Sequence, residues 1–294
     1  MEKRRERLIH LVHCRGAGWR TIEKIYASDP SLESVFSLSP AEIADRLNIP
    51  FHDASRLYSD LHEKPVETFI REYEQERISL ITIFDEQYPP LLKQIHQPPW
   101  VLFARGNPDL LQNPRTIAVV GTRTPTRYGL LAADLIVEGL VEKDFLIVSG
   151  FARGIDIRAQ RRALEGGGNT VAVLGSGFYH IYPKESAPLL RSYPGQLLLL
   201  SEYPPDTPPK KHQFPQRNRI ISGLSLGTVV VEARERSGSL ITAQFALDYG
   251  REVFAVPGPV TSPVSAGTNR LIQEGAKLVQ RAEDILEELF LFRA

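Results

Sequence analysis

The 294-residue sequence has little that would suggest secretion or membrane insertion. Its single cysteine, Cys14, excludes an intramolecular disulfide and favours a reducing compartment. No run reaches the roughly 18 consecutive apolar residues of a membrane span, and the charged first residues lack the apolar core and small-residue cleavage site of a signal peptide. Positive charge is not in excess either, because Lys and Arg number 35 and so do Asp and Glu. We therefore expect a cytoplasmic protein whose affinity for nucleic acid, if it has any, is local.

The motifs of nucleotide cofactors and of common catalytic centres are also missing. A Rossmann dinucleotide site needs G-x-G-x-x-G and then an acid after the second strand, whereas Gly121-Thr122-Arg123 lacks the second glycine and Ser149-Gly150 supplies no acid. Neither the P-loop signature nor the G-x-S-x-G nucleophile elbow occurs. His10 and His13 share a helix face beside Cys14, but no further ligand completes a metal set. The sequence predicts no cofactor and no metal.

Against this neutral background, the segment from Lys210 to Arg219 is conspicuous. Its ten residues hold an aromatic ring, Phe214, and four cations, and they directly precede an apolar stretch. The cations are Lys210, Lys211, Arg217 and Arg219. Cations neutralise phosphates and bases stack on aromatic rings, so the segment indicates a ligand that is both polyanionic and rich in flat bases.

Residues 1 to about 62 are expected to be helical. An apolar face begins at Leu8, is interrupted by Gly16-Ala17-Gly18 and resumes at Ile22, which is the outline of a helix-hairpin-helix unit. Such a turn can offer backbone N–H groups to a phosphate. The alternative, a helical module that only packs, is favoured slightly because Leu47-Asn48-Ile49-Pro50 lacks the glycines of a second hairpin.

From residue 115 onward, short apolar runs alternate with helical patterns. Their continuous apolar character indicates strands buried on both faces and therefore a parallel sheet. The expected strands are Ile117–Val120, Phe145–Val148, Val171–Leu174, Leu197–Leu200, Thr228–Val231 and Val253–Val256. The sequence thus predicts an α/β fold, a doubly wound and mostly parallel extended Rossmann-like sheet, with a small all-α domain at residues 1–65. The α/β domain is expected at residues 66–294, with its core at 115–290.

The loops after these strands carry the candidate chemistry, because open parallel sheets bind ligands at the carboxyl ends of their strands. Gly238 and Ser239 open a helix and can direct backbone donors at an anion. Arg123, after the first strand, could close over the same anion with a two-pronged hydrogen bond. Alternatively, the serine only caps its helix and Arg123 pairs with Glu202 or Glu232.

Three loop carboxylates keep open the hypothesis that the protein is an enzyme. Glu202 and Glu232 are the pair placed for hydrolysis, although orienting loop amides and arginines is the favoured role for them. Asp156, at a helix start, is as readily a cap as a catalytic group. Arg153 begins a second basic set nearby, part of which is expected to be salt-bridged.

Five blocks of this sequence, in order and spacing, closely resemble the DprA/Smf family. The blocks are Ile117–Arg123, Ser149–Asp156, Leu200–Pro205, Phe214–Ser225 and Arg236–Ala243. The resemblance runs from about Tyr88 to about Leu286. It implies a protein of natural transformation that is not an ordinary enzyme, that binds and protects incoming single-stranded DNA, and that helps to load the RecA recombinase. It also implies a homodimer built through the α/β domain.

The same resemblance implies which residues contact DNA. Arg123, Lys211 and Phe214 fall at the main contact positions, and the K-x-x-F spacing of the family is kept, whereas Lys210 and His212 are not expected to take part. The wider expected contact set adds Arg217, Arg219, Gly121, Gly150, Arg153, Gly238 and Ser239. For Arg217 and Arg219 the choice between phosphate contact and bracing of the segment stays open.

Two further points qualify the resemblance. Many members carry a C-terminal winged-helix-like domain, and the sequence has no room for one before Ala294. The competing enzyme hypothesis is a nucleotide-phosphate hydrolase resembling the LOG proteins, but their P-G-G-x-G-T-x-x-E signature is replaced here by Arg236-Ser237-Gly238-Ser239-Leu240. A protein-interaction scaffold with a merely solvated basic segment is the third alternative.

Overall fold

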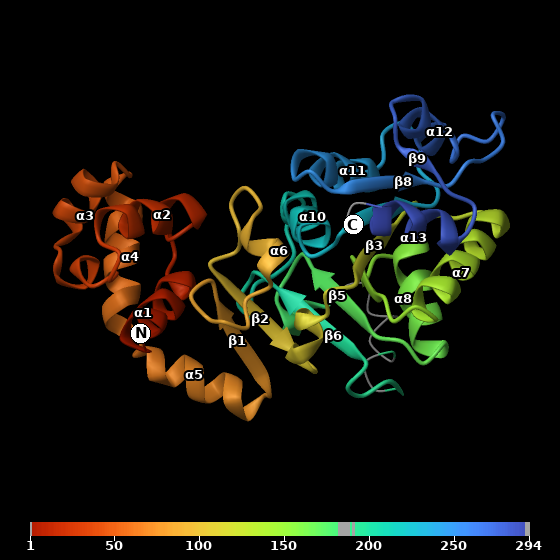
Figure 1. Ribbon diagram of the computed structural model, residues 1–294. Coiled ribbons are helices and arrows are strands. Elements are labelled where there is room, and N and C mark those ends of the chain that lie inside the picture. Colours follow the sequence, from red (N-terminus) through yellow and green to blue (C-terminus); the bar gives the residue numbers. More distant parts are fainter. Residues whose placement is uncertain (1, 182–188, 190–191, 292–294) are drawn as a thin grey trace. The chain divides into compact units, whose positions relative to one another are not determined.

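The computed structural model describes residues 2–181, 189 and 192–291, and the chain in it separates into two compact units (Figure 1). The first unit spans Met1–Tyr88 and Pro99–Phe103, and the second spans Pro89–Pro98 and Ala104–Ala294. The boundary expected at residues 65/66 falls inside the first unit, between helices α4 (Phe51–Glu63) and α5 (Val66–Gln75). That boundary stays a prediction, and the ends of the two expected domains, residues 1 and 292–294, lie outside the described residues.

The second unit is built on a parallel sheet whose strands follow the order β6-β5-β4-β3-β7-β8-β9. The strands are β3 (Thr116–Val120), β4 (Leu146–Ser149), β5 (Thr170–Leu174), β6 (Leu197–Ser201), β7 (Gly227–Val230), β8 (Glu252–Ala255) and β9 (Lys277–Leu278). All residues of β3, β4 and β5 are buried, which is why they read as unbroken apolar runs. The predicted doubly wound, mostly parallel α/β fold is confirmed.

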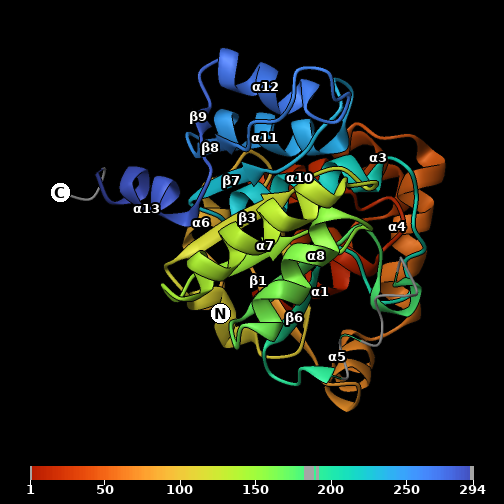
Figure 2. The ribbon, with the colours of Figure 1, turned by 90° about the vertical axis from the view of Figure 1, so that its right-hand side faces the viewer.

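Helices cover both faces of this sheet. On one face, α7 (Arg127–Val141), α8 (Ile155–Glu165) and α13 (Ala282–Leu291) share an apolar core with Ile117 and Val119 of β3. Figure 2 shows α7 and α8 side by side in front of the strands. On the other face, α10 (Gln213–Gly223) and α11 (Gly238–Asp248) pack against each other and against β5 and β7. The shorter elements of this unit are α6 (Pro90–Lys93), η2 (Pro108–Gln112), η3 (Phe178–His180) and α12 (Ala266–Gln273).

The strand order reverses at β3. From this strand the chain runs outward through β4, β5 and β6 on one side, and then returns to pair β7 with β3 on the other side. Two neighbouring strands whose connections leave in opposite directions open a crevice at their carboxyl ends, where ligands of doubly wound sheets bind. The loops after β3 and β7 are therefore the expected walls of a site.

The basic segment 210–219 is largely helical, because α10 begins at Gln213. The sequence pattern did not predict this helix. The polar residues Arg217, Asn218 and Arg219 are buried in this helix, so polar and apolar residues do not separate onto two faces. A helix without that separation gives no periodic signal in the sequence.

The first unit is helical over its N-terminal residues, as predicted. Its elements are α1 (Glu2–His13), α2 (Trp19–Ser28), η1 (Ser34–Ser37), α3 (Pro40–Leu47), α4 (Phe51–Glu63), α5 (Val66–Gln75), β1 (Ile78–Thr82) and the start of β2 (Val101–Arg105). At the turn between α1 and α2, Gly16 has a φ of +84°, and the backbone N–H of Arg15 donates to the Asp60 carboxylate at 2.7 Å. A carboxylate bound to this turn opposes an approaching phosphate, so these contacts fit the packing module better than the DNA-binding hairpin.

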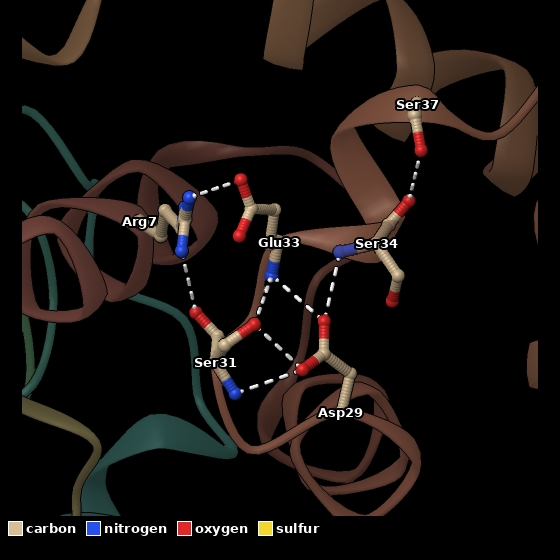
Figure 3. A network of polar contacts seen from close by, with 6 residues as sticks. All are labelled: Arg7, Asp29, Ser31, Glu33, Ser34 and Ser37. Atoms are coloured by element: carbon tan, nitrogen blue, oxygen red, sulfur yellow. Dashed lines mark hydrogen bonds and ion pairs between the residues drawn. The ribbon is translucent and has the colours of Figure 1, made fainter.

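A polar network fixes the turn that follows α2 (Figure 3). The Asp29 carboxylate accepts hydrogen bonds from the backbone N–H of Ser31 at 2.9 Å, from the Ser31 hydroxyl at 2.7 Å and from the N–H of Ser34 at 2.8 Å. These donors hold the pKa of Asp29 well below its usual range. Arg7 reaches the same turn through the Ser31 carbonyl at 3.1 Å and the Glu33 carboxylate at 2.8 Å, so α1 is tied to η1.

The described residues contain neither a membrane-spanning helix nor a cluster of three metal-binding side chains. No helix there combines the length and the apolar character needed to cross a bilayer. Over the same residues, His, Cys, Asp and Glu side chains do not gather in groups of three or more that could hold a metal ion.

Candidate nucleic-acid interface

A cleft of about 750 Å³ opens at the switch point of the second unit. Its walls come from the loop after β3, the loop after β7 with the first turn of α11, and the first half of α10 with the residues before it. Among the ten predicted contact residues, seven line this cleft: Gly121, Arg123, Lys211, Phe214, Arg217, Gly238 and Ser239. Gly150 and Arg153 line a small hollow that shares Arg123, Phe214 and Arg217 with the cleft, whereas Arg219 lines neither.

The lining of the cleft is strongly cationic although the whole chain is neutral. Its described charged residues are one acid, Asp156, and five cations, Arg123, Lys210, Lys211, Arg217 and Arg236. A concave site with charge of one sign concentrates its field and attracts anions of the opposite sign. In a neutral chain, affinity for nucleic acid needs a local patch of positive charge, and the cleft at the switch point has one.

Arg123 is exposed, and no hydrogen bond or ion pair of its side chain occurs among the described residues. Its expected alternative partners are engaged elsewhere. Glu202 forms an ion pair with Arg219, and Glu232 accepts hydrogen bonds from the N–H and the hydroxyl of Thr126 at 2.9 and 2.6 Å. Glu202 thus orients an arginine of α10, and Glu232 orients the N-cap residue of α7; orienting neighbouring groups is the role that the sequence favoured for them over hydrolysis.

The first turn of α11 forms the opposite wall. The Ser237 hydroxyl lies 2.8 Å from that of Ser239 and accepts from the Ser239 N–H at 3.4 Å, so the capping alternative is realised. The carbonyl of Gly238 accepts from the Asn218 amide at 3.1 Å, which fixes this turn to α10. The positive end of the α11 dipole therefore lies in the cationic wall and adds to its attraction for anions.

Lys211 lies just before α10, and Phe214 lies in the first turn of this helix. Lys211 is exposed, while Phe214 is half-buried with its ring against Gly175. A Cβ at Gly175 would lie only 3.0 Å from Cδ1 of the ring, so a larger residue there would push Phe214 out of place. The K-x-x-F spacing puts the two residues about one turn apart, and both of them line the cleft.

Arg217, by contrast, is only 4% exposed and braces the base of the cleft. Its guanidinium donates to the carbonyl of Gly150 at 2.5 Å and to that of Val173, which ties α10 to the ends of β4 and β5. Gly150 lies between two charged groups, because a Cβ on it would be 2.5 Å from Nη1 of Arg217 and 2.6 Å from Oδ2 of Asp156. Predicted as a DNA contact, Gly150 is therefore a site of close packing in this structure.

Burial changes the ionisation of both charged groups at this base. Desolvation raises the pKa of Asp156 to about 6, against the opposing charge of Arg217 and the hydrogen bond from the Gly150 N–H. Desolvation likewise lowers the pKa of Arg217 to about 10. Arg217 therefore stays charged at neutral pH. Its charge is held beside Asp156 at the floor of the cleft and is not that of a free cation.

Arg219 is the one predicted contact that lines neither the cleft nor the small hollow beside it. Its side chain is 11% exposed and pairs with Glu202, which is 16% exposed. For both Arg217 and Arg219, bracing is thus the role that their contacts support. Two further cations line the cleft. Lys210 was not expected to take part in binding, and Arg236 was not among the predicted contacts, although its position just before the helix-opening Ser237-Gly238 was an available signal.

Comparisons with known proteins agree on one family. The sequence profile of the family described as "DNA recombination-mediator protein A" matches residues 79–290. DNA processing protein DprA of Bacillus subtilis is 49% identical over 217 residues, covering 74% of this chain and 73% of that protein. DNA processing protein DprA of Streptococcus pneumoniae is 45% identical over 215 residues, covering 73% of this chain and 76% of that protein.

Two solved structures share the fold. The X-ray structure of DprA from Streptococcus pneumoniae superposes with a TM-score of 0.84 at 37% identity, over 96% of this chain and 97% of that one. DNA processing protein A from Helicobacter pylori, whose structure is described as giving insight into its single-stranded DNA binding mode, superposes with a TM-score of 0.65 at 30% identity. That match covers 73% of this chain and 96% of the other.

Proposed function

The chain belongs to the DNA recombination-mediator protein A family, and from this premise we propose that it binds single-stranded DNA in the cationic cleft of its second unit. The observation that carries the proposal is the composition of the cleft wall. Exposed Arg123 and Lys211 stand beside the half-buried ring of Phe214 and the first turn of α11. Phosphates would be neutralised by the two cations and by the helix terminus, while a base stacks on the ring.

The Phe214 ring in the cleft wall favours a single strand over a duplex as the ligand. In a duplex the bases are stacked on each other, whereas a single strand can turn a base onto an aromatic side chain. All bases have a flat face, so such contacts tolerate any sequence. A solved relative from Helicobacter pylori is described in terms of its single-stranded DNA binding mode, which supports the same ligand here.

We further propose the wider role that the family resemblance implies. The protein would act in the cytoplasm as a homodimer, protect incoming single-stranded DNA during natural transformation and help to load RecA onto it, without catalysing a reaction of its own. A dimer presenting two clefts to one strand would gain affinity, because the second contact is intramolecular. Faster RecA assembly on a single strand in the presence of this protein, with no gain for a cleft variant, is the expected result.

The central test is a DNA titration with charge-reversal variants. Fluorescence anisotropy with labelled oligo-dT and with duplex, each at two salt concentrations, should show tighter binding of the single strand that weakens as salt rises. Arg123→Glu and Lys211→Glu should each weaken binding at least about tenfold, because each replaces an attraction to phosphate with a repulsion.

A matched control is Arg161→Glu. Arg161 is exposed on α8 and does not line the cleft, so this variant changes the net charge equally and should keep near-wild-type binding. Circular dichroism should show all three variants folded. Wild-type affinity in both cleft variants, or no preference for the single strand, would contradict the proposal.

A further inference from the structure

A second aromatic surface lies on the same edge of the sheet as the cleft but outside it. Resting on the proposed function, we propose that Tyr128 and Arg127, at the start of α7, form a second stacking platform that extends the path of the single strand beyond the cleft. The platform takes a base on the Tyr128 ring and the adjoining phosphate on Arg127.

Tyr128 combines exposure with a fixed orientation. Its side chain is 45% exposed, yet its hydroxyl donates a hydrogen bond of 2.6 Å to the carbonyl of Pro257 in the loop after β8. Burial of the hydroxyl and the charge of Glu232 raise its pKa, so the hydroxyl keeps the proton of that bond at neutral pH. A ring anchored at both ends loses little conformational freedom on binding, which favours stacking.

The charges around the ring favour a phosphate. Arg127 is exposed, and no ion pair of its side chain occurs among the residues described. The neighbouring carboxylate, Glu232, is 2% exposed and points inward, where it accepts the hydrogen bonds of Thr126 at the N-terminus of α7. The negative charge is thus buried under the loop while the positive charge faces solvent.

The platform lies within a few nucleotides of the cleft. Arg123 lines the cleft, and Tyr128 follows it by five residues, a span of at most about 17 Å even for extended chain. Glu232, which fixes the Arg123–Tyr128 loop through Thr126, is itself at the end of β7, four residues before the cleft residue Arg236. One continuous strand can therefore contact both surfaces.

The competing occupant of this surface is another protein. Leu131 and Leu135, 58% and 57% exposed, continue the apolar stripe of Tyr128 along α7. At the Tyr128 end, however, Arg127 has no ion pair among the described residues, whereas further along the helix Asp134 and Glu138 pair with arginines of α8. This polarity favours DNA at the helix start, and it makes Leu131→Ala a matched control on the same helix.

The test compares oligonucleotides of two lengths. An oligo-dT of about 5 nucleotides fills the cleft alone, whereas one of about 20 reaches both surfaces. Tyr128→Ala should weaken binding of the long strand about 5-fold or more and leave the short strand unchanged, because one stacked base is lost. Tyr128→Phe should retain most of the long-strand affinity, Arg127→Gln should reduce its salt dependence, and Leu131→Ala should behave as wild type.

A fluorescent base makes the assignment direct. With 2-aminopurine placed at successive positions of the long strand, stacking should quench two separate positions. Phe214→Ala should remove one and Tyr128→Ala the other. Equal affinity of Tyr128→Ala and wild type for the long strand overturns the platform, as does an equal loss on both lengths or a changed oligomeric state in Tyr128→Ala and Leu131→Ala alike. Binding of neither length by the wild-type protein would instead overturn the proposed function itself.

Discussion

The two ends of the basic segment 210–219 carry the same charge in opposite surroundings. At one end, Lys210 and Lys211 are exposed and line the cleft. At the other end, Arg217 and Arg219 are less than 10% exposed as whole residues, and their guanidinium groups hold backbone carbonyls and the Glu202 carboxylate. A buried cation whose guanidinium is held by partners inside the protein is shielded from a ligand, whereas an exposed one keeps its charge for a phosphate.

Within these ten residues, we therefore expect the buried cations to stabilise the fold and the exposed cations to bind DNA. Removing a cation at the buried end should cost folding free energy, because its partners lose their hydrogen bonds inside the protein. Removing one at the exposed end should cost affinity for DNA and almost no stability. Three predictions test this division, and the largest effect is expected at Arg217.

Arg217→Met should lower the free energy of unfolding by about 3–5 kcal/mol, because it leaves Asp156 buried without its positive partner and frees the carbonyls of Gly150 and Val173. The same substitution at Lys211 is the matched control and should change stability by less than about 0.5 kcal/mol. Urea denaturation of both variants measures the contrast. Similar midpoints for the two would show that the buried end does not brace the fold.

The ionisation of Asp156 should give the next largest effect. Its folded-state pKa of about 6 lies above the ordinary 3.8, so the folded protein keeps this proton over a pH range in which the unfolded chain releases it. Stability from this group is therefore full below about pH 4 and is lost as pH rises to about 6, by roughly 3 kcal/mol in all.

Other groups titrate in the same range, so the quantity to measure is the difference between wild type and Asp156→Asn. Unfolding free energies at pH 4, 5, 6 and 7 should show the wild type losing stability relative to the variant as pH rises. A difference that is constant with pH, or one that grows in the opposite direction, would contradict the assignment.

The smallest expected effect is on the salt dependence of binding. If Lys211 neutralises one phosphate of a single strand, Lys211→Gln should reduce the slope of log affinity against log salt by about 0.7. Arg219→Gln should leave that slope unchanged, since Arg219 does not line the cleft. Anisotropy titrations at four salt concentrations decide between them, and a reduced slope in Arg219→Gln would return that arginine to the DNA-contacting set.

Much of the α/β unit was predictable from local sequence. The six expected strands are all present, with bounds shifted by no more than one residue, because strands buried on both faces are written as unbroken apolar runs. The helix α10 was not predictable in this way. Its buried face includes Arg217 and Asn218, whose partners lie on β4, β5 and α11, so no local pattern records why they are buried.

Some residues of the candidate site were likewise predictable from the sequence, and others were not. Arg123, Lys211 and Phe214 were expected from the sequence, and the structure brings them to one cleft. The place of Arg236 in the lining could have been inferred from its position before Ser237-Gly238, whereas the position of Arg219 outside the cleft followed from neither charge nor spacing. Arg219 lies outside the cleft because its side chain on α10 points toward Glu202, which lies in the loop after β6.

By itself, the sequence determined the fold class, the helical N-terminal residues and the supply of cations and an aromatic ring near position 214, because apolar periodicity and residue chemistry are local properties. Only the tertiary structure decided which cations face solvent. Arg123 and Arg236 line one cleft because β3 and β7 are neighbours in the sheet while their connections leave in opposite directions, and Lys211 joins them because α10 packs against β5 and α11. That pairing is set by packing between distant segments, and the same packing turns Arg217 inward to hold the base of the cleft.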